Sequence, residues 1–151
     1  MKFSTRKDAD IPAERLFAAI TDFPRLERML MRRGIAVARI DPAQEPGPCM
    51  AWRIGFDWRG RRRDLGLDVT RFDRPERVTI AGLSDPFDLV IDMTVVALSR
   101  TRSRLIFETD LRPRNMRSRL MLQTAKLGKA QLDRRFARRI GEFMGEVASA
   151  A

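Results

Sequence analysis

The sequence predicts an α+β fold: a curved antiparallel sheet of about seven strands wrapped around a long C-terminal helix, with two short helices after the first strand. Apolar and polar residues alternate through six segments between residues 35 and 111, which is the period of half-buried strands. The segment 115–147 lacks proline and repeats apolar residues at helical spacing. A chain of 151 residues is the size of one domain, so residues 1–151 are expected to share one core.

The first strand is expected within residues 2–11, where every second residue belongs to a moderately apolar face and the residues between them are polar. Pro12 then starts a helix, because its fixed φ suits a first helical position. Asp22 and Pro24 interrupt this helix, and a second short helix follows until Gly34 stops it. The apolar stripe of the first helix is Leu16, Phe17 and Ile20.

After a strand at 35–41 and a loop at 42–48, two strands are expected to pair across a tight turn at Arg59-Gly60. This pairing places both apolar sets on one face and therefore defines the register. It also places Asp57 opposite Arg62. The expected pairs are Trp58 with Arg61, Phe56 with Arg63, Ile54 with Leu65, Trp52 with Leu67 and Met50 with Val69.

Three further strands, at 77–83, 87–98 and 105–111, follow with short turns, which indicates an antiparallel meander. One face is apolar along most strands, so one face should be covered and the other wet. A single helix over 115–147 would be roughly 50 Å long at ~1.5 Å per residue, long enough to cover that face. Its expected buried residues are Leu120, Leu127, Phe136 and Ile140.

Missing residue types restrict the chemistry. The chain has no His and no Tyr, which excludes Ser-His-Asp, Cys-His and His-metal sites. Cys49 is the single cysteine, so it has no partner for an internal disulfide or a metal site, and a reducing cytoplasm is the expected location. The sequence contains no run of about 18 apolar residues, so no membrane-spanning helix is expected. No cofactor is expected either.

The net charge of +10 and the pI of about 11.3 favour a polyanionic partner such as nucleic acid. However, 26 of the 30 basic residues are Arg and they occur in every segment, as codon usage in a GC-rich genome also produces. Nucleic acid is therefore a less favoured partner, and the oligomeric state is not predicted.

Three stretches are similar to those of a known family. They are 11–17 with Asp22-Phe23-Pro24, then Trp52 and Phe56 before Gly60-Arg61, then Leu98 with Thr101 and Arg104-Leu105. With these stretches in this order, the whole chain resembles the START/Bet v1-like (SRPBCC) superfamily, in particular its bacterial polyketide cyclase/dehydrase-like and lipid-transport branch, which has a helix-grip fold. Arg102-Ser103 departs from the Gly-Thr that the family often has in this turn.

The resemblance implies an apolar ligand held between sheet and helix. The residues themselves add that Gly128 and its small neighbours either leave room for a ligand or allow close packing with the short helices. The aromatic residues either line a cavity or fill a core. Arg63 or Arg71 is the expected polar anchor, because each extends an apolar row at the end of its strand. The candidate cavity residues are Trp52, Ile54, Phe56, Leu67, Val69, Met93, Phe107, Leu120, Thr124 and Gly128.

The acidic residues of the strands alternate with the apolar ones and should therefore point away from the covered face. No carboxylate is expected to face the ligand, and no catalytic residue is assigned. Binding or transport of a hydrophobic molecule, lipid-like or aromatic and with or without an acidic group, is the leading hypothesis. A cyclase/dehydratase-type enzyme and a ribosome- or RNA-associated protein are the alternatives. The acids in the outer phase are Asp57, Asp64, Asp68, Asp92 and Glu108.

Overall fold

The computed structural model describes residues 1–41, 47–58 and 60–149. Its seven strands form one antiparallel sheet in the order β1-β7-β6-β5-β4-β3-β2. This confirms the predicted α+β fold. The elements are β1 (Lys2–Ala9), α1 (Ala13–Ile20), α2 (Phe23–Arg32), β2 (Ala36–Arg39), β3 (Ala51–Trp58), β4 (Arg61–Asp73), β5 (Arg77–Leu83), β6 (Phe87–Ala97), β7 (Ser103–Pro113), α3 (Met116–Lys126) and α4 (Lys129–Ser149).

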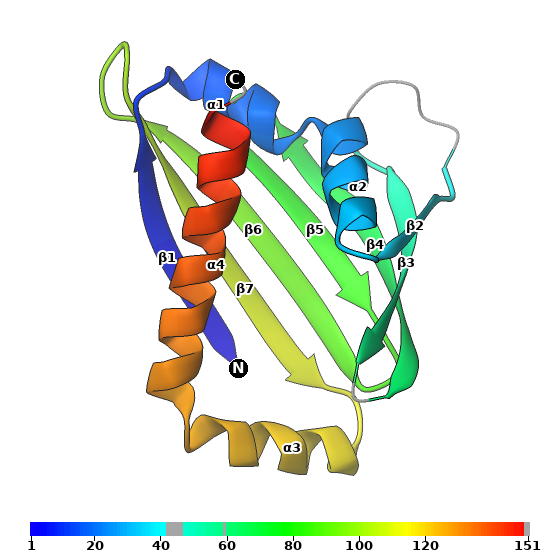
Figure 1. Cartoon of the computed structure of the whole chain (residues 1–151). Coiled ribbons are helices and arrows are strands. Elements are labelled where there is room, and N and C mark those ends of the chain that lie inside the picture. The colour runs from blue at the N-terminus through cyan, green and yellow to red at the C-terminus, as the bar shows by residue number, and fades with distance from the viewer. Residues whose placement is uncertain (42–46, 59, 150–151) are drawn as a thin grey trace.

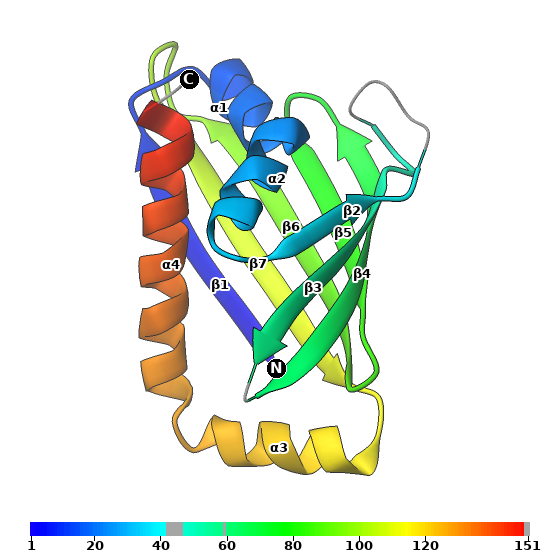
Figure 2. The ribbon, with the colours of Figure 1, turned by 45° about the vertical axis from the view of Figure 1, so that its right-hand side comes forward.

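Helices α1, α2 and α4 lie on the same side of the curved sheet (Figures 1 and 2). Helices α1 and α2 lie over one end of it, and α4 runs along the edge formed by β1 and β7. Helix α3 crosses beyond the other end, where the β3–β4 and β5–β6 turns also lie (Figure 2). We call the helix side of the sheet the inner face and the opposite side the outer face.

The register of the β3–β4 hairpin is confirmed. Trp58 pairs with Arg61, Phe56 with Arg63, Ile54 with Leu65 and Trp52 with Leu67. The Val69 N–H donates to the Met50 carbonyl over 2.8 Å, which continues the same register. Asp57 and Arg62 face each other on the outer face, with 3.8 Å between the carboxylate and the guanidinium. Arg59, and residues 42–46 of the predicted loop, lie outside the described residues.

Aromatic contacts hold the helices on the inner face. Phe23 of α2 packs on Trp52 with ring centroids 5.0 Å apart. Phe136 of α4 lies between Phe3 and Phe107, at 5.4 and 5.7 Å. Rings in this range of distances attract each other beyond the area they bury. The apolar stripe predicted for α1 is confirmed, since Leu16, Phe17 and Ile20 are fully buried.

The predicted single helix over 115–147 is wrong. Helix α3 ends at Lys126 and α4 begins at Lys129. At the break, the N–H groups of Leu127 and Gly128 donate to carbonyls only three residues back, over 3.2 and 3.0 Å. Gly in a helix interior costs about 1 kcal/mol relative to Ala, which makes Gly128 an inexpensive place to interrupt the helix. The two helices then meet at a corner (Figure 1).

The predicted buried residues are half right. Ile140 is buried and Phe136 is half-buried against the sheet, but Leu120 and Leu127 are 58% and 89% exposed. Helix α3 instead buries the side that carries Ser118 and Leu122. Apolar residues occur on several sides of α3, so its spacing alone does not select a face. Ser118 tolerates burial because its hydroxyl bonds to the capping residue Asn115.

A β-bulge in β4 corrects a second prediction. Val69 pairs with Ile80, but the next pair is Arg71 with Thr79, so β4 carries an extra residue there. Directly opposite residues share a face, and Thr79 lies on the outer face with Asp92. Arg71 therefore leaves the inner row and forms an ion pair with Asp73. The simple alternation of the sequence does not show the extra residue.

Candidate functional site

The candidate site is the part of the inner face that the helices leave partly open. Elsewhere on the inner face, the apolar side chains of the sheet are buried in the core. On strands β3 to β6, a group of apolar side chains on the same face is only half-buried. They extend from the row that pairs with Val69 toward the turns that join β3 to β4 and β5 to β6. We call these residues the inner-face patch: Phe56, Leu65, Leu67, Ile80, Leu89 and Ile91.

The strand residues proposed for a cavity occupy two settings. Trp52, Ile54, Val69 and Met93 are buried in the core beside α1 and α2. Phe56, Leu67 and Phe107 are half-buried at the margin of that core. Phe107 is packed by Phe136 and Phe143 of α4. The first group therefore forms part of the packed interior, and Phe56 and Leu67 remain available to a ligand.

The helix residues proposed for the same cavity point elsewhere. Leu120 and Thr124 are exposed on α3, and Gly128 is exposed in the turn before α4. A Cβ atom added at Gly128 would meet only the Ala125 carbonyl oxygen, at 3.9 Å. Gly128 therefore neither opens a space above the sheet nor packs against α1 and α2. These three residues are corrections to the sequence-based site.

Of the two arginines expected to be a polar anchor, Arg63 keeps its predicted place on the inner face. It lies opposite Phe56 on the inner face, and its guanidinium is 5.5 Å from the centre of the Trp58 ring. Its Nε atom is buried and has no hydrogen-bond partner among the described residues. Buried polar atoms normally have partners, so an unpaired donor beside an apolar surface indicates a place for an acceptor.

Thr109 is a second such position. It faces Ile91 across the β6–β7 pair, and its Oγ1 atom is buried without a hydrogen-bond partner in the described part of the chain. Val69, Ile80, Ile91 and Thr109 follow one another across four strands. Arg63 lies three strands away and six residues further along β4, roughly 20 Å along and 14 Å across the sheet. The two polar groups therefore lie in separate parts of the inner face.

Glu27 is a residue that the sequence analysis missed. Its carboxylate, on α2, accepts a hydrogen bond from the indole N–H of Trp52 over 2.7 Å and is half-buried. Glu27 is therefore a carboxylate in contact with Trp52, one of the residues proposed to line the cavity. The pKa of the nearby Arg39 is raised, first by its hydrogen bond to Asp41 and further by the charges of Asp41 and Glu27. The alternation of residues along the strands could not place Glu27, because this residue lies on a helix.

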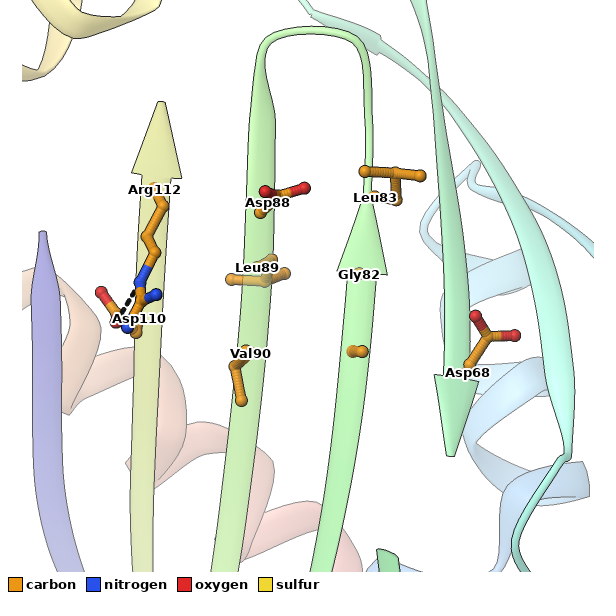
Figure 3. A pocket seen from close by; sticks show the side chains of 9 residues that line it. Asp68, Gly82, Leu83, Asp88, Leu89, Val90, Asp110 and Arg112 are labelled. Carbon is orange, nitrogen blue, oxygen red and sulfur yellow. Dashed lines mark hydrogen bonds and ion pairs between the residues drawn. The ribbon is translucent and has the colours of Figure 1, made fainter. Parts of the chain in front are cut away.

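A hollow of about 410 Å³ lies on the outer face (Figure 3), and of the inner-face patch only Leu89 contributes to its lining. Its floor includes the exposed side chain of Val90, and the Asp110 carboxylate at its edge forms a 3.0 Å ion pair with Arg112. It is a depression in an open sheet surface, and its best-placed polar groups are already paired. We therefore do not regard it as the functional site. The side chains of Asp68, Asp88, Leu83 and Leu89 complete the view in Figure 3.

Within residues 1–41, 47–58 and 60–149, no cluster of acidic or cysteine side chains is arranged to hold a metal ion. None of the described helices combines the length and apolarity needed to cross a bilayer.

Comparison with solved structures relates this geometry to known folds. The protein TTHA0849 of Thermus thermophilus matches with a TM-score of 0.72 at 12% identity, over 100% of this chain and 99% of that one. The ZhuI aromatase/cyclase of Streptomyces sp. R1128 matches with 0.64 at 14% identity, over 91% and 90%. A START superfamily protein of Mycobacterium smegmatis matches with 0.58 at 14%, over 89% and 95%.

No protein-family model and no curated protein sequence matches the chain. At these identities the structural matches show the fold. They agree with the seven-stranded sheet, the two short helices after β1 and the C-terminal helix on the sheet that the structure contains. The chain therefore has the helix-grip fold of START and Bet v1-like proteins.

Proposed function

We propose that this chain binds a hydrophobic small molecule with an acidic group on the inner-face patch. The proposal rests on the buried Nε of Arg63, at the end of a half-buried apolar surface, which has no hydrogen-bond partner in the described part of the chain. Binding sites are mostly apolar with a few polar groups that orient the ligand, and this surface has that composition. The fold is typical of hydrophobic ligand binding, which supports the proposal without naming the ligand.

Arg63 is suited to recognise a carboxylate or a phenolate. A guanidinium is planar and permanently charged, and it donates parallel hydrogen bonds to carboxylate oxygens. Its position over Trp58 holds the side chain in place without using its donors. The ligand's apolar body would then lie along Phe56, Leu65 and Leu67. Native mass spectrometry of the protein purified from its own host would identify the molecule by mass.

Replacing Arg63 by Ala is expected to weaken binding of fatty acids and aromatic acids by about tenfold or more, because it removes a charge-assisted hydrogen bond. Binding of the corresponding alcohols should change little. Displacement of a fluorescent fatty-acid probe measures both. Arg62→Ala is the matched control, since it removes the same charge from the neighbouring residue, whose side chain is on the outer face. Equal losses in the two variants would contradict a specific role for Arg63.

Glu27 supports a second candidate function, a cyclase/dehydratase-type enzyme. A half-buried carboxylate beside an aromatic ring is a candidate general base, if a substrate reaches it. The carboxylate already accepts a hydrogen bond from the indole N–H of Trp52, so a substrate that used it as a base would have to compete with that bond.

Glu27→Gln tests this candidate, because the amide keeps an acceptor for Trp52 and cannot take a proton. For an enzyme, turnover of a polyketide-like substrate should fall by at least about a hundredfold, with substrate affinity preserved. A binding protein should show no turnover in either form, and ligand affinity should stay within about threefold of the parent value.

A further inference from the structure

The end of the molecule that carries α3 combines exposed apolar side chains with unpaired cations. Five of its large hydrophobic residues are at least 43% exposed. Two of them, Trp58 and Leu83, end strands β3 and β5 next to the turns that lie at this end. The other three are on α3 and in the turn that follows it. The exposed fractions are Trp58 43%, Leu83 53%, Met116 65%, Leu120 58% and Leu127 89%.

Met116 and Leu120 lie on one side of α3, and Leu127, the C-cap residue with helical φ and ψ, continues that side. Met116, Leu120 and Leu127 are separated by four and seven residues, so at 100° per residue they fall within about 40° of one another. The side of α3 that contacts the rest of the protein carries Ser118 and Leu122 instead. The exposed stripe therefore makes no contribution to the core, and burying it would require a partner outside the chain.

The charge of this segment is of one sign. Between Asp110 and Asp133 the sequence contains six Lys or Arg residues and no acid. Three of these, Arg117, Arg119 and Lys126, are exposed and have no ion pair among the described residues. Exposed Arg61, which begins β4 next to the β3–β4 turn, adds positive charge at the same end. The partner should therefore be anionic as well as apolar.

We propose that this end of the protein, which we call the α3 surface (Trp58, Leu83, Met116, Leu120 and Leu127 with Arg117, Arg119 and Lys126), docks on an anionic lipid membrane. Helices that lie in a bilayer interface carry an apolar stripe flanked by Lys and Arg, as α3 does. Tryptophan favours the same interface, because its ring is apolar and its N–H is polar. Phosphate contacts to a nucleic acid would use the cations and leave the exposed Leu and Met side chains without a role. The inference does not depend on the ligand proposal.

The test is co-sedimentation of the full chain with vesicles of phosphatidylcholine alone, or of phosphatidylcholine mixed with phosphatidylglycerol. We expect binding to the mixed vesicles and at least about tenfold weaker binding to the neutral ones. Raising the salt from 0.1 M to 1 M shortens the Debye length from ~10 to ~3 Å and should release the protein. Equal binding to both vesicle types, or to neither, would overturn the proposal.

Two double variants separate the contributions. Leu120→Gln with Leu127→Gln removes the stripe, and Arg117→Gln with Arg119→Gln removes two cations; each should lower mixed-vesicle affinity about tenfold or more. Ile40→Gln is the apolar control, since Ile40 is also 58% exposed but lies outside the α3 surface. The charge control is the double variant Arg6→Gln with Arg53→Gln. Both residues are exposed and lie on the outer face of the sheet. Loss of affinity in the controls equal to that in the α3 variants would contradict a local site.

A gel-shift assay with a single-stranded RNA distinguishes a polyanion site from a membrane site. We expect any RNA binding to be weak, equally sensitive to the Arg117/Arg119 and Arg6/Arg53 variants, and unaffected by the leucine variant. RNA binding that is tight, depends on α3 cations alone and occurs without vesicle binding would replace the membrane by a nucleic acid and overturn the proposal.

Discussion

Replacing Phe136 by Ala is expected to lower the free energy of unfolding by about 3 kcal/mol, whereas Leu127→Ala should change it by less than about 0.5 kcal/mol. Phe136 packs on Phe3 and Phe107 and joins α4 to two strands, so its removal leaves a cavity between helix and sheet. Leu127 is 89% exposed and leaves none. Urea unfolding followed by far-UV circular dichroism measures both values.

This pair tests the break between α3 and α4. In a single straight helix lying on the sheet, Leu127 would face the core with the other residues of the apolar pattern, and truncating it would cost roughly 2–5 kcal/mol. A large loss of stability in Leu127→Ala would therefore show that the C-terminal helix is continuous in solution. An unchanged midpoint in Phe136→Ala would show that α4 is not packed on β1 and β7.

Replacing Ile91 by Trp should weaken binding of any ligand on the inner-face patch by at least about tenfold. Ile91 is half-buried at the β6 edge of the patch, and an indole there would occupy space that the ligand's apolar body needs. Titration with fatty acids and with their neutral alcohols measures the effect. Both classes should lose affinity, in contrast to Arg63→Ala, which should affect the acids selectively.

Val90→Trp is the matched control for this variant. Val90 is the preceding residue of β6, is 39% exposed and lies on the outer face, so the same large side chain is added on the opposite side of one strand. Its ligand affinity should stay at the parent value. Equal affinity in both variants, each shown to be folded by its thermal unfolding curve, would place the ligand away from the inner face. If the outer variant alone lost affinity, the hollow of Figure 3 would become the binding site.

Much of the sheet was predictable because a strand with one buried face has a strict period of two. A slip of one residue between β3 and β4 would move Trp52, Ile54 and Phe56 to the wet face, so the pattern allows one register only, and the structure has it. The same argument assigned the strand acids to the outer face. The order of strands and helices followed from short turns that leave few topologies open.

The candidate site was predictable only where it lies on regular strands. Phe56, Leu67 and Arg63 were placed on the inner face by alternation alone, and the register confirms that placement. Arg71 was misplaced because one extra residue at the bulge reverses the alternation after Val69. Glu27 was missed because contact between α2 and β3 depends on how the helix docks, which neither segment encodes by itself.

Burial of one sheet face imposes a periodicity that can be read locally, and this periodicity was enough to predict the fold, the hairpin register and the inner row of apolar residues. The position of the break in the C-terminal helix depends instead on tertiary packing, because a straight helix and a helix interrupted at Gly128 have almost the same local pattern. Tertiary packing also decided which side of α3 is buried, and so left Leu120 and Leu127 exposed among cations. That choice depends on which surface meets β7, and the energy of the contact is distributed over residues far apart in the chain.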